Sequence, residues 1–463
     1  MTLHTPLGET ASADANTHLT RIASALIASV EQRQFTVGIL GLGYVGLPLA
    51  EAFVSVGMPV VGFEINASKL KALAERRSYI RHIGDDRIAA MCDSGRFLAT
   101  QDAEELRRAD ALLMCVPTPI NAHREPDLTY VVKTTEMIGK ILRRGQIVIL
   151  ESTTYPGTTE EIIRPILEQA SGLKAGIDFG LAYSPEREDP GNLDFTTTAI
   201  PKVVGADSDV ELSIAVAMYS ALTQTVPVSN LKTAEAVKLT ENIFRLVNIS
   251  LVNELKFVFG GMDIDVWEVI DAARTKPFGY MAFYPGPGIG GHCIPIDPFY
   301  LTWKARGFGL STRMIDLAGD IADALPRSVV EKTSEALDRS LSKSISSSNI
   351  LIVGVAYKKN IDDLRESPAL PILEILSRRG ARVAYYDPHV ESAHEAHGVS
   401  PEITAMKSVS YDAETLKEFD CAIIVTDHTV VDYQLLLECV PIVIDTRNAT
   451  VDLRERYGHK IVR

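Results

Sequence analysis

The stretch TVGILGLGYVGLPLAEAFVSVGMPVVGFE, residues 36–64, decides the fold. It contains an apolar run at 36–40, a glycine-rich turn, an apolar helical segment at 47–56 and a second apolar run at 60–63. A β-branched run, a helical segment and another such run indicate the β-α-β unit of a parallel sheet. The turn has the spacing G-x-G-x-x-G, follows the first strand directly and opens the helix, which is the context of a dinucleotide-binding turn.

Each glycine of the turn has a physical task. Gly41 permits the tight turn, Gly43 lets the backbone approach a pyrophosphate, and Gly46 allows close packing of helix on strand. The helix N-terminus supplies unpaired N–H groups and a positive dipole end. Glu64 ends the second strand, where a carboxylate accepts hydrogen bonds from a ribose and repels a 2′-phosphate, so NAD is favoured over NADP. The alternative is a purely structural turn, with Glu64 paired to Lys69.

The α/β pattern continues along the chain. Further apolar runs at 111–116 and 147–150 extend the first sheet, the strand signal disappears between about 230 and 327, and strands return at 350–357, 381–387, 421–427 and 441–445. We therefore predict an α/β fold with two Rossmann-like, doubly wound parallel-sheet domains joined by a helical middle domain. The expected divisions are an N-terminal tail and helix at 1–34, a nucleotide-binding domain at 35–228, a helical domain at 229–330 and the second Rossmann-like domain at 331–463.

Composition excludes several classes of protein. A chain of 463 residues with 46% hydrophobic and 23% charged residues is expected to form two or three globular domains. The formal net charge of -14 repels phosphate backbones, so nucleic acid and anionic membranes are not expected partners. We find no apolar run of 18 residues and no signal-peptide pattern, so a cytoplasmic location is expected.

One of the five cysteines stands apart from the others. The five are scattered without a C-x-x-C pair, so neither a disulfide scaffold nor a metal site is expected. Cys293 lies in YPGPGIGGHCIPIDPFY, residues 284–300, after four glycines and four residues before Asp297. A helix beginning near Cys293 would lower the thiol pKa and make a nucleophile, with Asp297 on the same face. A buried structural cysteine is the alternative, and it is our interpretation of the other four.

A second pair of polar residues belongs to the helical middle. Lys238 and Asn242 are spaced i, i+4 in KLTEN, so an amine and an amide point from one helix face. Together they are suited to bind a reacting oxygen, although a solvated helix face explains this spacing equally well.

These motifs occur in the order seen in the nucleotide-sugar 6-dehydrogenases: GLGYVG, CVPTP (115–119), ESTTYPGTT (151–159), SPERE (184–188), AEAVKLTEN (234–242), PGPGIGGHCIPIDP (285–298) and KKNIDDLRESP (358–368). From about Phe35 to the C-terminus the chain resembles the UDP-glucose/GDP-mannose dehydrogenase family. Within it, the region around Cys293 is most similar to the bacterial UDP-N-acetylglucosamine 6-dehydrogenases of surface-polysaccharide synthesis.

The resemblance implies a four-electron oxidation of the C6 hydroxyl of a UDP-N-acetylhexosamine, with UDP-GlcNAc the expected substrate and NAD the cofactor. A simple dehydrogenase stops at the aldehyde, whereas a thiolate that adds to the aldehyde gives a thiohemiacetal that can be oxidised again. The catalytic positions implied are Cys293, Lys238, Asp297, Asn242, Glu186 and Thr153. Asp297 would activate water for thioester hydrolysis, and Lys238 would stabilise the oxyanion.

Further positions follow from the same resemblance. Those implied for the cofactor are Gly41, Gly43, Tyr44, Val45, Gly46, Glu64, Lys69, Val116, Pro117, Thr118, Thr153 and Arg365. Those implied for the UDP-sugar are Glu186, Arg187, Lys238, Asn242, Arg274, Phe283, Tyr284, Gly286, Gly288, Tyr357, Lys358 and Arg447. The family also implies a homodimer, or a higher homo-oligomer, formed through the helical middle, with Arg274 reaching the neighbour's substrate.

Several alternatives stay open. The sequence does not distinguish UDP-GlcNAc from UDP-ManNAc, UDP-GalNAc or UDP-glucose, because an epimer moves a single group. A two-electron hydroxyacid dehydrogenase would use the lysine and asparagine without a thiol. A non-catalytic sensor of NAD or nucleotide sugars would use the glycine-rich loops for binding alone.

Overall fold

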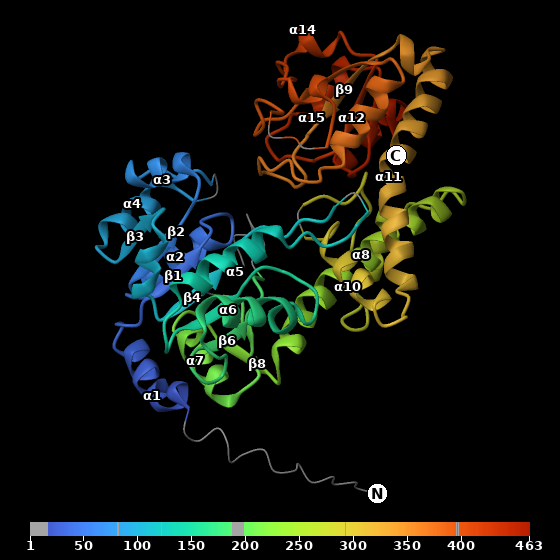
Figure 1. Ribbon diagram of the computed structural model, residues 1–463. Coiled ribbons are helices and arrows are strands. Elements are labelled where there is room, and N and C mark those ends of the chain that lie inside the picture. Colours follow the sequence, from blue (N-terminus) through green and yellow to red (C-terminus); the bar gives the residue numbers. More distant parts are fainter. Residues whose placement is uncertain are drawn as a thin grey trace, which may run out of the picture. The chain divides into compact units, whose positions relative to one another are not determined.

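The chain forms two compact units. A computed structural model describes residues 17–80, 83–121, 123–187, 199–291, 293–394, 396 and 398–463, and the chain divides into Met1–Thr240 and Glu241–Arg463. The long helix α8 (Leu231–Gly260) begins in the first unit and ends in the second (Figure 1).

The first unit is built on an eight-stranded sheet in the order β3-β2-β1-β4-β5-β6-β7-β8. Every neighbouring pair is parallel except β6 and β7, which are antiparallel. The first six strands have the 3-2-1-4-5-6 order of a dinucleotide-binding sheet. The strands are β1 (Val37–Leu40), β2 (Val60–Phe63), β3 (Phe97–Thr100), β4 (Ala111–Met114), β5 (Ile147–Leu150), β6 (Gly180–Tyr183), β7 (Lys202–Gly205) and β8 (Thr225–Val228).

Helices cover both faces of this sheet, which is why its central strands are apolar at every position. Residues of α1, α2, α4 and α7 pack on one face, and residues of α5 and α6 pack on the other. The helices are α1 (His18–Glu31), α2 (Gly46–Ser55), α3 (Ala67–Ala74), α4 (Asp85–Asp93), η2 (Ala103–Arg108), α5 (Thr129–Ile141), the π-helical turn η3 (Thr159–Ile163), α6 (Arg164–Ser171) and α7 (Asp209–Ser220).

The N-terminal helix is an integral part of the first unit. The side chain of Thr17 caps α1, and Leu19, Ala23 and Val30 are buried in the core under the sheet. The backbone N–H of Leu19 also donates to the carbonyl of Ile177 at 3.0 Å. The expected tail before this helix falls at residues 1–16, which lie outside the described residues.

The second unit combines helices with a five-stranded parallel sheet in the order β10-β9-β11-β12-β13. Residues of α11 and α12 pack on one face of this sheet, and residues of α14 and α15 pack on the other. Its strands are β9 (Asn349–Val353), β10 (Arg382–Tyr386), β11 (Cys421–Ile424), β12 (Ile442–Asp445) and β13 (Ile461–Val462). Its helices are α9 (Val266–Ala273), α10 (Asp297–Arg306), α11 (Arg313–Leu341), η4 (Ile345–Ser347), α12 (Ala369–Arg378), α13 (Pro401–Thr404), α14 (Ala413–Leu416), α15 (Tyr433–Cys439), η5 (Val451–Leu453), α16 (Arg454–Tyr457) and η6 (Gly458–Lys460).

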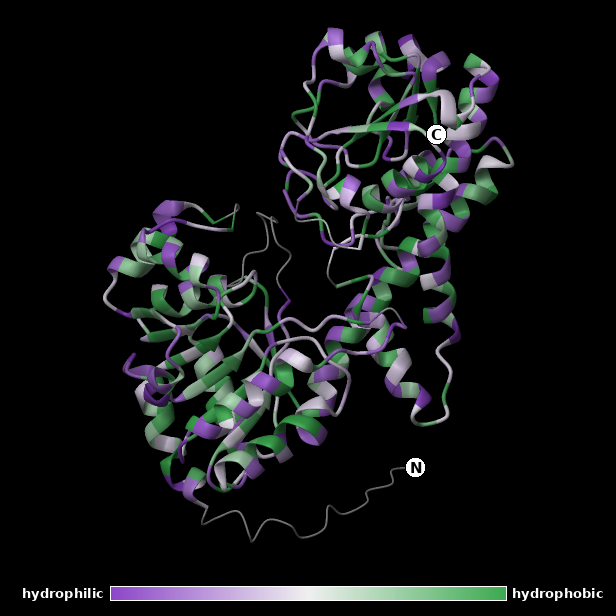
Figure 2. Ribbon diagram, turned by 45° about the horizontal axis from the view of Figure 1, so that its top comes forward, coloured by the Kyte–Doolittle hydropathy of each residue, from purple (hydrophilic) through white to green (hydrophobic). Residues whose placement is uncertain are grey.

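The predicted fold class is confirmed. Two Rossmann-like sheet regions are separated along the chain by a helical region. Within each sheet region the hydropathy follows the layers, with apolar strands inside and hydrophilic residues on the outer faces of helices (Figure 2). Two details differ from expectation. The pair β6–β7 is antiparallel, and the helix after the cysteine begins at Asp297 rather than near Cys293.

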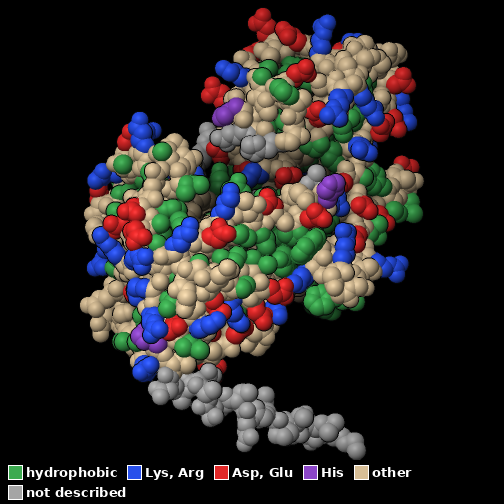
Figure 3. Space-filling model, viewed as in Figure 1, with side chains coloured by type: hydrophobic (Ala, Val, Ile, Leu, Met, Phe, Trp, Pro, Cys, Tyr) green, Lys and Arg blue, Asp and Glu red, His purple; other side chains and the backbone are tan. Residues whose placement is uncertain are grey.

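The domain divisions at 34/35, 228/229 and 330/331 stay a prediction, and the last falls within α11. Over the described ranges, no helix has the length and hydropathy of a membrane span. On the face seen in Figure 3, Lys and Arg side chains are interspersed with Asp and Glu.

Candidate functional site

The three glycines of the G-x-G-x-x-G turn do different structural work. Gly41 has φ +96°, and a Cβ there would lie 2.4 Å from the carbonyl oxygen of Cys115. A Cβ on Gly46 would lie 1.9 Å from the carbonyl oxygen of Gly41, so helix and strand approach too closely for a side chain. A Cβ on Gly43 would meet no atom within 4 Å. Tyr44 and Val45 complete the turn, and no side chain caps α2. The turn therefore fits a pyrophosphate group.

Glu64 lies directly beside this turn at the end of β2. Its side chain is buried, and its Oε2 accepts from the backbone N–H of Leu42 and from Nζ of Lys69, both at 3.2 Å. Its Oε1 accepts from the backbone N–H of Asn66 at 2.9 Å. The carboxylate thus anchors the turn and forms an ion pair with Lys69, at the position where a Rossmann acid meets a ribose.

The adjacent strand ends supply the other predicted cofactor positions. The Oγ of Ser152 accepts from the backbone N–H of Val116 at 2.9 Å and donates to its carbonyl at 2.7 Å, which joins the segments after β4 and β5. Pro117 and Thr118 follow on the first segment, and the half-buried Thr153 follows on the second. All lie past the carboxyl ends of parallel strands, where α/β sheets bind ligands.

A buried ionic cluster lies near Glu186 in the same unit. Nζ of Lys202 is 2.7 Å from Oε2 of Glu151 and 3.6 Å from Oε2 of Glu186. Although burial opposes it, the two carboxylates raise the pKa of Lys202 above its ordinary value. Tyr219 donates to the other oxygen of Glu151. Nζ of Lys238 donates to the carbonyl of Glu186 at 2.5 Å, so predicted site residues from distant segments meet here.

Sequence reasoning missed Glu151 and Lys202. The carboxylate and the ammonium are 51 positions apart, and although Glu151 begins the ESTTYPGTT motif, nothing local pairs it with Lys202, so only the fold brings them together. Arg187, a predicted substrate ligand, donates its backbone N–H to Oε1 of Glu186 at 2.7 Å and its guanidinium to the carbonyl of Pro201 at 2.6 Å.

The cysteine of the glycine-rich segment is followed by a tight turn in the second unit. The carbonyl oxygen of the half-buried Cys293 accepts from the backbone N–H of Asp297 at 2.8 Å, and α10 begins at Asp297. Nδ2 of Asn242 donates to Oδ2 of Asp297 at 2.5 Å, and Arg245 donates to Oδ1 of Asn242. Asn242 and Asp297 are both buried. Asn242 lies one turn after Lys238 on α8.

The glycines before Cys293 pack against the segment after β9. A Cβ on Gly290 or Gly291 would lie 2.6 or 2.9 Å from Tyr357, a Cβ on Gly288 (φ +155°) would lie 2.6 Å from Pro368, and a Cβ on Gly286 would lie 2.6 Å from Arg447. The backbone N–H of Gly291 donates to the carbonyl of Arg365 at 2.9 Å. The predicted residues Gly286, Gly288, Tyr357, Arg365 and Arg447 therefore gather in one region, with Lys358 next to Tyr357.

Arg365 and Arg447 are already engaged in this region. The guanidinium of Arg365 forms a two-pronged ion pair with the carboxylate of Asp363, with a shortest distance of 2.6 Å. Nε of Arg447 donates to the carbonyl of Val425 at 2.8 Å, and burial lowers the pKa of its guanidinium.

Three predicted substrate residues lie around α9. The hydroxyl of Tyr284 donates to Oδ1 of Asp271 at 2.6 Å and accepts from Arg274 at 3.2 Å, and its ring stacks on Trp267 at 5.7 Å. The ring of Phe283 meets Phe244 edge-on at 5.8 Å. Arg274 thus bonds within its own chain, and its role at a neighbour's substrate stays a prediction.

A buried Asp–His pair, which sequence reasoning also missed, supports the loop after β9 that carries Tyr357 and Lys358. Oδ2 of Asp387 accepts from the backbone N–H groups of Val355 and Ala356 at 2.7 and 3.1 Å and lies 3.0 Å from Nε2 of His428. Nδ1 of His428 accepts from the backbone N–H of Asn360 at 2.9 Å, so its Nε2 carries the proton donated to Asp387. Against the effect of burial, these bonds hold the pKa of Asp387 below its ordinary value.

The fold and the site together define a class of dinucleotide-binding enzymes that have a second Rossmann-like domain. Residues 35–223 match the NAD-binding domain of the UDP-glucose/GDP-mannose dehydrogenase family, residues 232–324 its central domain and residues 351–452 its UDP-binding domain. The chain belongs to this family of NAD-dependent UDP-sugar dehydrogenases.

Individual relatives cover most of the chain. The UDP-N-acetyl-D-glucosamine 6-dehydrogenase of Pseudomonas aeruginosa is 37% identical over 374 residues, which is 80% of this chain and 87% of the relative. The UDP-N-acetyl-D-mannosamine dehydrogenase of Pyrococcus horikoshii is 36% identical over 366 residues, 78% and 85% of the two chains. The solved structure of a UDP-D-ManNAc dehydrogenase from Pyrococcus horikoshii matches with a TM-score of 0.80 at 32% identity, covering 90% of this chain and 96% of that one.

Proposed function

We propose that this chain oxidises the C6 hydroxyl of UDP-GlcNAc to a carboxylate in a four-electron, NAD-dependent reaction through covalent intermediates on Cys293. The observation that carries the proposal is the grouping around the cysteine. Its carbonyl anchors the turn to Asp297, and the carboxylate of Asp297 is held by the amide of Asn242. A half-buried thiol, a buried carboxylate and an amide donor are the groups that a thioester-forming dehydrogenase needs.

The residues of the first unit fit NAD. The open space above Gly43 and the uncapped start of α2 suit a pyrophosphate, and Glu64 suits a ribose without a 2′-phosphate. NAD, when bound, accepts the hydride of each oxidation. Tyr44, Val45, Lys69, Val116, Pro117, Thr118, Thr153 and Arg365 are the further residues proposed to hold it.

Cys293 is the residue that allows a second oxidation. Its thiolate adds to the aldehyde carbon, forming a C–S bond and a hydroxyl-bearing tetrahedral carbon, the thiohemiacetal. Oxidation of this carbon leaves a thioester, and water cleaves the C–S bond to release the carboxylate and return the thiol. Each sugar therefore yields two NADH and consumes one water.

The neighbouring polar residues transfer protons and stabilise the charge that develops during the reaction. Asp297 activates the hydrolytic water, and Lys238 and Asn242 stabilise the oxyanion that develops on the sugar oxygen. Glu186 and Thr153 orient water or assist proton transfer. The contact of Lys238 with the carbonyl of Glu186 supports a shared role for these two residues.

The second unit supplies most of the substrate-binding residues in this proposal. Tyr357, Lys358 and Arg447 bind the diphosphate or the uridine, since they gather with the glycine-rich loop at Gly286 and Gly288. Phe283 and Tyr284 shape an apolar wall for the N-acetyl group, Arg187 contributes from the first unit, and Arg274 reaches the substrate of a neighbouring subunit.

UDP-ManNAc is the second candidate substrate. It is favoured by a specific observation, because relatives named for UDP-N-acetyl-D-mannosamine match this chain at 33–37% identity, a range that overlaps the 35–37% of the relatives named for the glucosamine compound. Both sugars carry the N-acetyl group and differ in stereochemistry at C2 alone. The geometry of the sugar pocket decides which epimer is preferred.

The proposal includes a homodimer formed through the helical region. Three apolar side chains of α8, Phe244, Leu251 and Val258, follow one another at intervals of seven residues and are 48%, 49% and 45% exposed in the single chain. Such a stripe is typical of a helix that packs against a partner.

A reaction with NAD and a reduced thiol is compatible with the cytoplasm and with a place in surface-polysaccharide synthesis.

A substrate panel followed to the endpoint tests this function. Limiting UDP-GlcNAc, UDP-ManNAc, UDP-GalNAc, UDP-glucose and GDP-mannose are each incubated with excess NAD, and NADH and uronic acid are counted. We expect two NADH per UDP-GlcNAc. One NADH per sugar supports a two-electron dehydrogenase, tight binding without turnover supports a sensor, and preferred oxidation of UDP-ManNAc supports the second candidate.

A further inference from the structure

A buried lysine outside the predicted site residues contacts the segment that carries Glu186. Lys202 is the first residue of β7, and its side chain is 7% exposed. Its Nζ lies 3.6 Å from Oε2 of Glu186 and donates to the carbonyl of Pro185 at 3.5 Å. The ammonium group of Lys202 therefore meets both the carboxylate of Glu186 and the backbone next to it.

Two other elements of the first unit hold this ammonium group in place. Glu151 directly follows β5 and is fully buried, and its Oε2 accepts from Nζ of Lys202 at 2.7 Å. Its Oε1 accepts from the hydroxyl of Tyr219, which belongs to α7. Nζ of Lys202 also lies 5.1 Å from the centroid of the Tyr219 ring. The position of the ammonium group is thus fixed by the sheet and by a helix that covers it.

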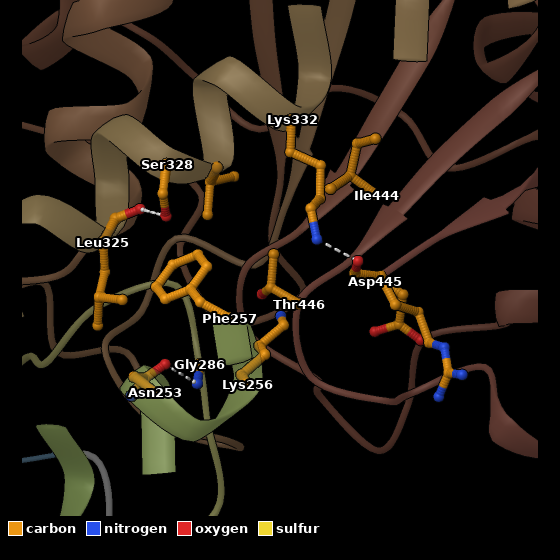
Figure 4. Close-up of a pocket in the computed structure, with 12 residues that line it drawn as sticks. Asn253, Lys256, Phe257, Gly286, Leu325, Ser328, Lys332, Ile444, Asp445 and Thr446 are labelled. Atoms are coloured by element: carbon orange, nitrogen blue, oxygen red, sulfur yellow. Dashed lines mark hydrogen bonds between the residues drawn. The ribbon is translucent and has the colours of Figure 1, made fainter. Parts of the chain in front are cut away.

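The positive charge of Lys202 is retained in spite of its burial. Burial favours the neutral form of a lysine. Lys256 shares a pocket with Lys332 (Figure 4), and burial followed by the charge of Lys332 lowers the pKa of Lys256 to about 8. Burial acts in the same direction on Lys202, but the carboxylates of Glu151 and Glu186 raise its pKa above the ordinary value. Lys202 is therefore a fixed cation between two carboxylates.

Glu186 is held at three of its atoms. Its Oε2 faces Lys202, and its Oε1 accepts from the backbone N–H of Arg187 at 2.7 Å. Its carbonyl accepts from Nζ of Lys238 at 2.5 Å. The guanidinium of Arg187 donates to the carbonyl of Pro201, the residue before Lys202, at 2.6 Å. A change at Lys202 is therefore transmitted to Glu186 directly and through the backbone beside it.

We propose that Lys202 is a positioning residue that keeps the carboxylate of Glu186 ionised and oriented for proton transfer during oxidation of the sugar. The inference rests on the proposed function, in which Glu186 assists proton transfer. A cation this close to a carboxylate favours its ionised form. A carboxylate that is held in one orientation also reacts faster than one that must first be aligned.

The other titratable and charged groups around Glu186 come from several elements. They are Cys115 after β4, Glu151 after β5, Arg187 next in the chain, Tyr219 on α7 and Lys238 on α8. Burial raises the pKa of the Cys115 thiol and of the Tyr219 hydroxyl, so both stay neutral. The charge of Lys202 is therefore opposed in this cluster by that of Glu151, which repels the ionised form of Glu186.

The fall of kcat at low pH tests the charge of Lys202. Lys202→Gln should move this acidic limb to higher pH by about one pH unit, because Glu186 loses a neighbouring cation. Glu151→Gln should move it to lower pH, because a repelling carboxylate is removed. Tyr219→Phe removes a hydrogen bond to Glu151 but keeps both charges, so this matched control should keep the wild-type limb. A purely structural defect lowers the active fraction at every pH and gives no shifts of opposite sign.

A double-mutant cycle shows whether Lys202 acts through Glu186. We measure kcat and KM at pH 7 for the wild type, Lys202→Gln, Glu186→Gln and the double variant, with the UDP-sugar that the wild type oxidises fastest. Lys202→Gln should lower kcat by about tenfold, with KM near wild type, because proton transfer through Glu186 is impaired. The same change should cost little further activity in Glu186→Gln, because the two residues act as one unit.

The outcomes separate this inference from the proposed function. A wild-type kcat and acidic limb in Lys202→Gln, or an equal loss of kcat in both backgrounds, overturns the inference while the slow turnover of Glu186→Gln leaves the proposed function standing. A wild type that oxidises no UDP-sugar, or a wild-type kcat in Glu186→Gln, refutes the proposed role of Glu186 and this inference with it. If Lys202→Gln does not fold, Glu151→Gln decides, and an unmoved limb in that variant overturns the inference.

Discussion

Gly43→Ala should weaken the binding of NAD and Gly46→Ala should lower the stability of the fold, although both glycines belong to one motif. A Cβ on Gly46 would lie 1.9 Å from the carbonyl oxygen of Gly41, and backbone cannot move aside cheaply. A Cβ on Gly43 would meet no protein atom within 4 Å. Gly46 therefore serves the packing of α2 on the sheet, whereas Gly43 keeps a space for the cofactor.

The magnitudes follow from these contacts. Overpacking at Gly46 should destabilise the chain by about 1–3 kcal/mol, which corresponds to a fall of about 2–4 °C in Tm for each kcal/mol in a unit of this size. Gly43→Ala should change the free energy of unfolding by no more than about 0.5 kcal/mol. It should raise the Kd for NAD by about tenfold or more, equivalent to about 1.4 kcal/mol, because the Cβ fills the space that the pyrophosphate needs.

Thermal unfolding without ligand and titration with NAD measure the two effects separately. Gly43→Ala should unfold like the wild type and bind NAD weakly, and Gly46→Ala should unfold early. A Gly43→Ala variant with wild-type affinity for NAD would refute the assignment of this space to the cofactor. A Gly46→Ala variant with wild-type Tm would refute the packing argument.

Three other changes give distinct readouts. Lys202→Met leaves the carboxylate of Glu151 buried without its ion pair and should cost about 3–5 kcal/mol in urea unfolding; an unchanged midpoint would contradict the buried pair. His428→Gln removes support from the loop that carries Lys358 and should raise KM for the UDP-sugar by about tenfold while kcat and the Kd for NAD stay near wild type; an unchanged KM argues against positioning. Burial raises the pKa of the Glu235 carboxyl to about 7. Above the ordinary pKa of a glutamate, about 4.5, the folded chain therefore keeps a proton that the unfolded chain releases. The free energy of unfolding should fall as the pH rises from about 4.5 to 7. Glu235→Gln should flatten this dependence in unfolding at pH 5 and pH 7.5, and an equal slope in both proteins would exclude Glu235 as its source.

Contacts between residues close in sequence could be predicted from local patterns. The G-x-G-x-x-G turn, the pairing of Glu64 with Lys69 five residues later and the approach of Asp297 to the carbonyl of Cys293 depend on residues close in sequence. Periodicity and spacing report such contacts well, because the geometry of one turn or one helix fixes them. The alternation of strands and helices likewise reports the two sheets.

Contacts across distant segments were invisible in the sequence. Lys202 meets Glu151 across 51 positions and His428 meets Asp387 across 41, and no spacing in the sequence relates the two members of either pair. The antiparallel pairing of β6 with β7 was not predicted for a related reason, because a four-residue strand has too few positions to indicate its direction in the sheet. Tertiary packing decides such features, which no local propensity encodes.

The yield of NADH per sugar in a cysteine variant tests the central claim most directly. Limiting UDP-GlcNAc is oxidised to the endpoint by the wild type, by Cys293→Ser and by the control Cys439→Ser, which alters another half-buried thiol of the same unit. The account predicts two NADH and one uronic acid per sugar for the wild type and the control, and little or no uronic acid for Cys293→Ser, whose hydroxyl is a far weaker nucleophile. Two NADH per sugar from Cys293→Ser at the wild-type rate would contradict it.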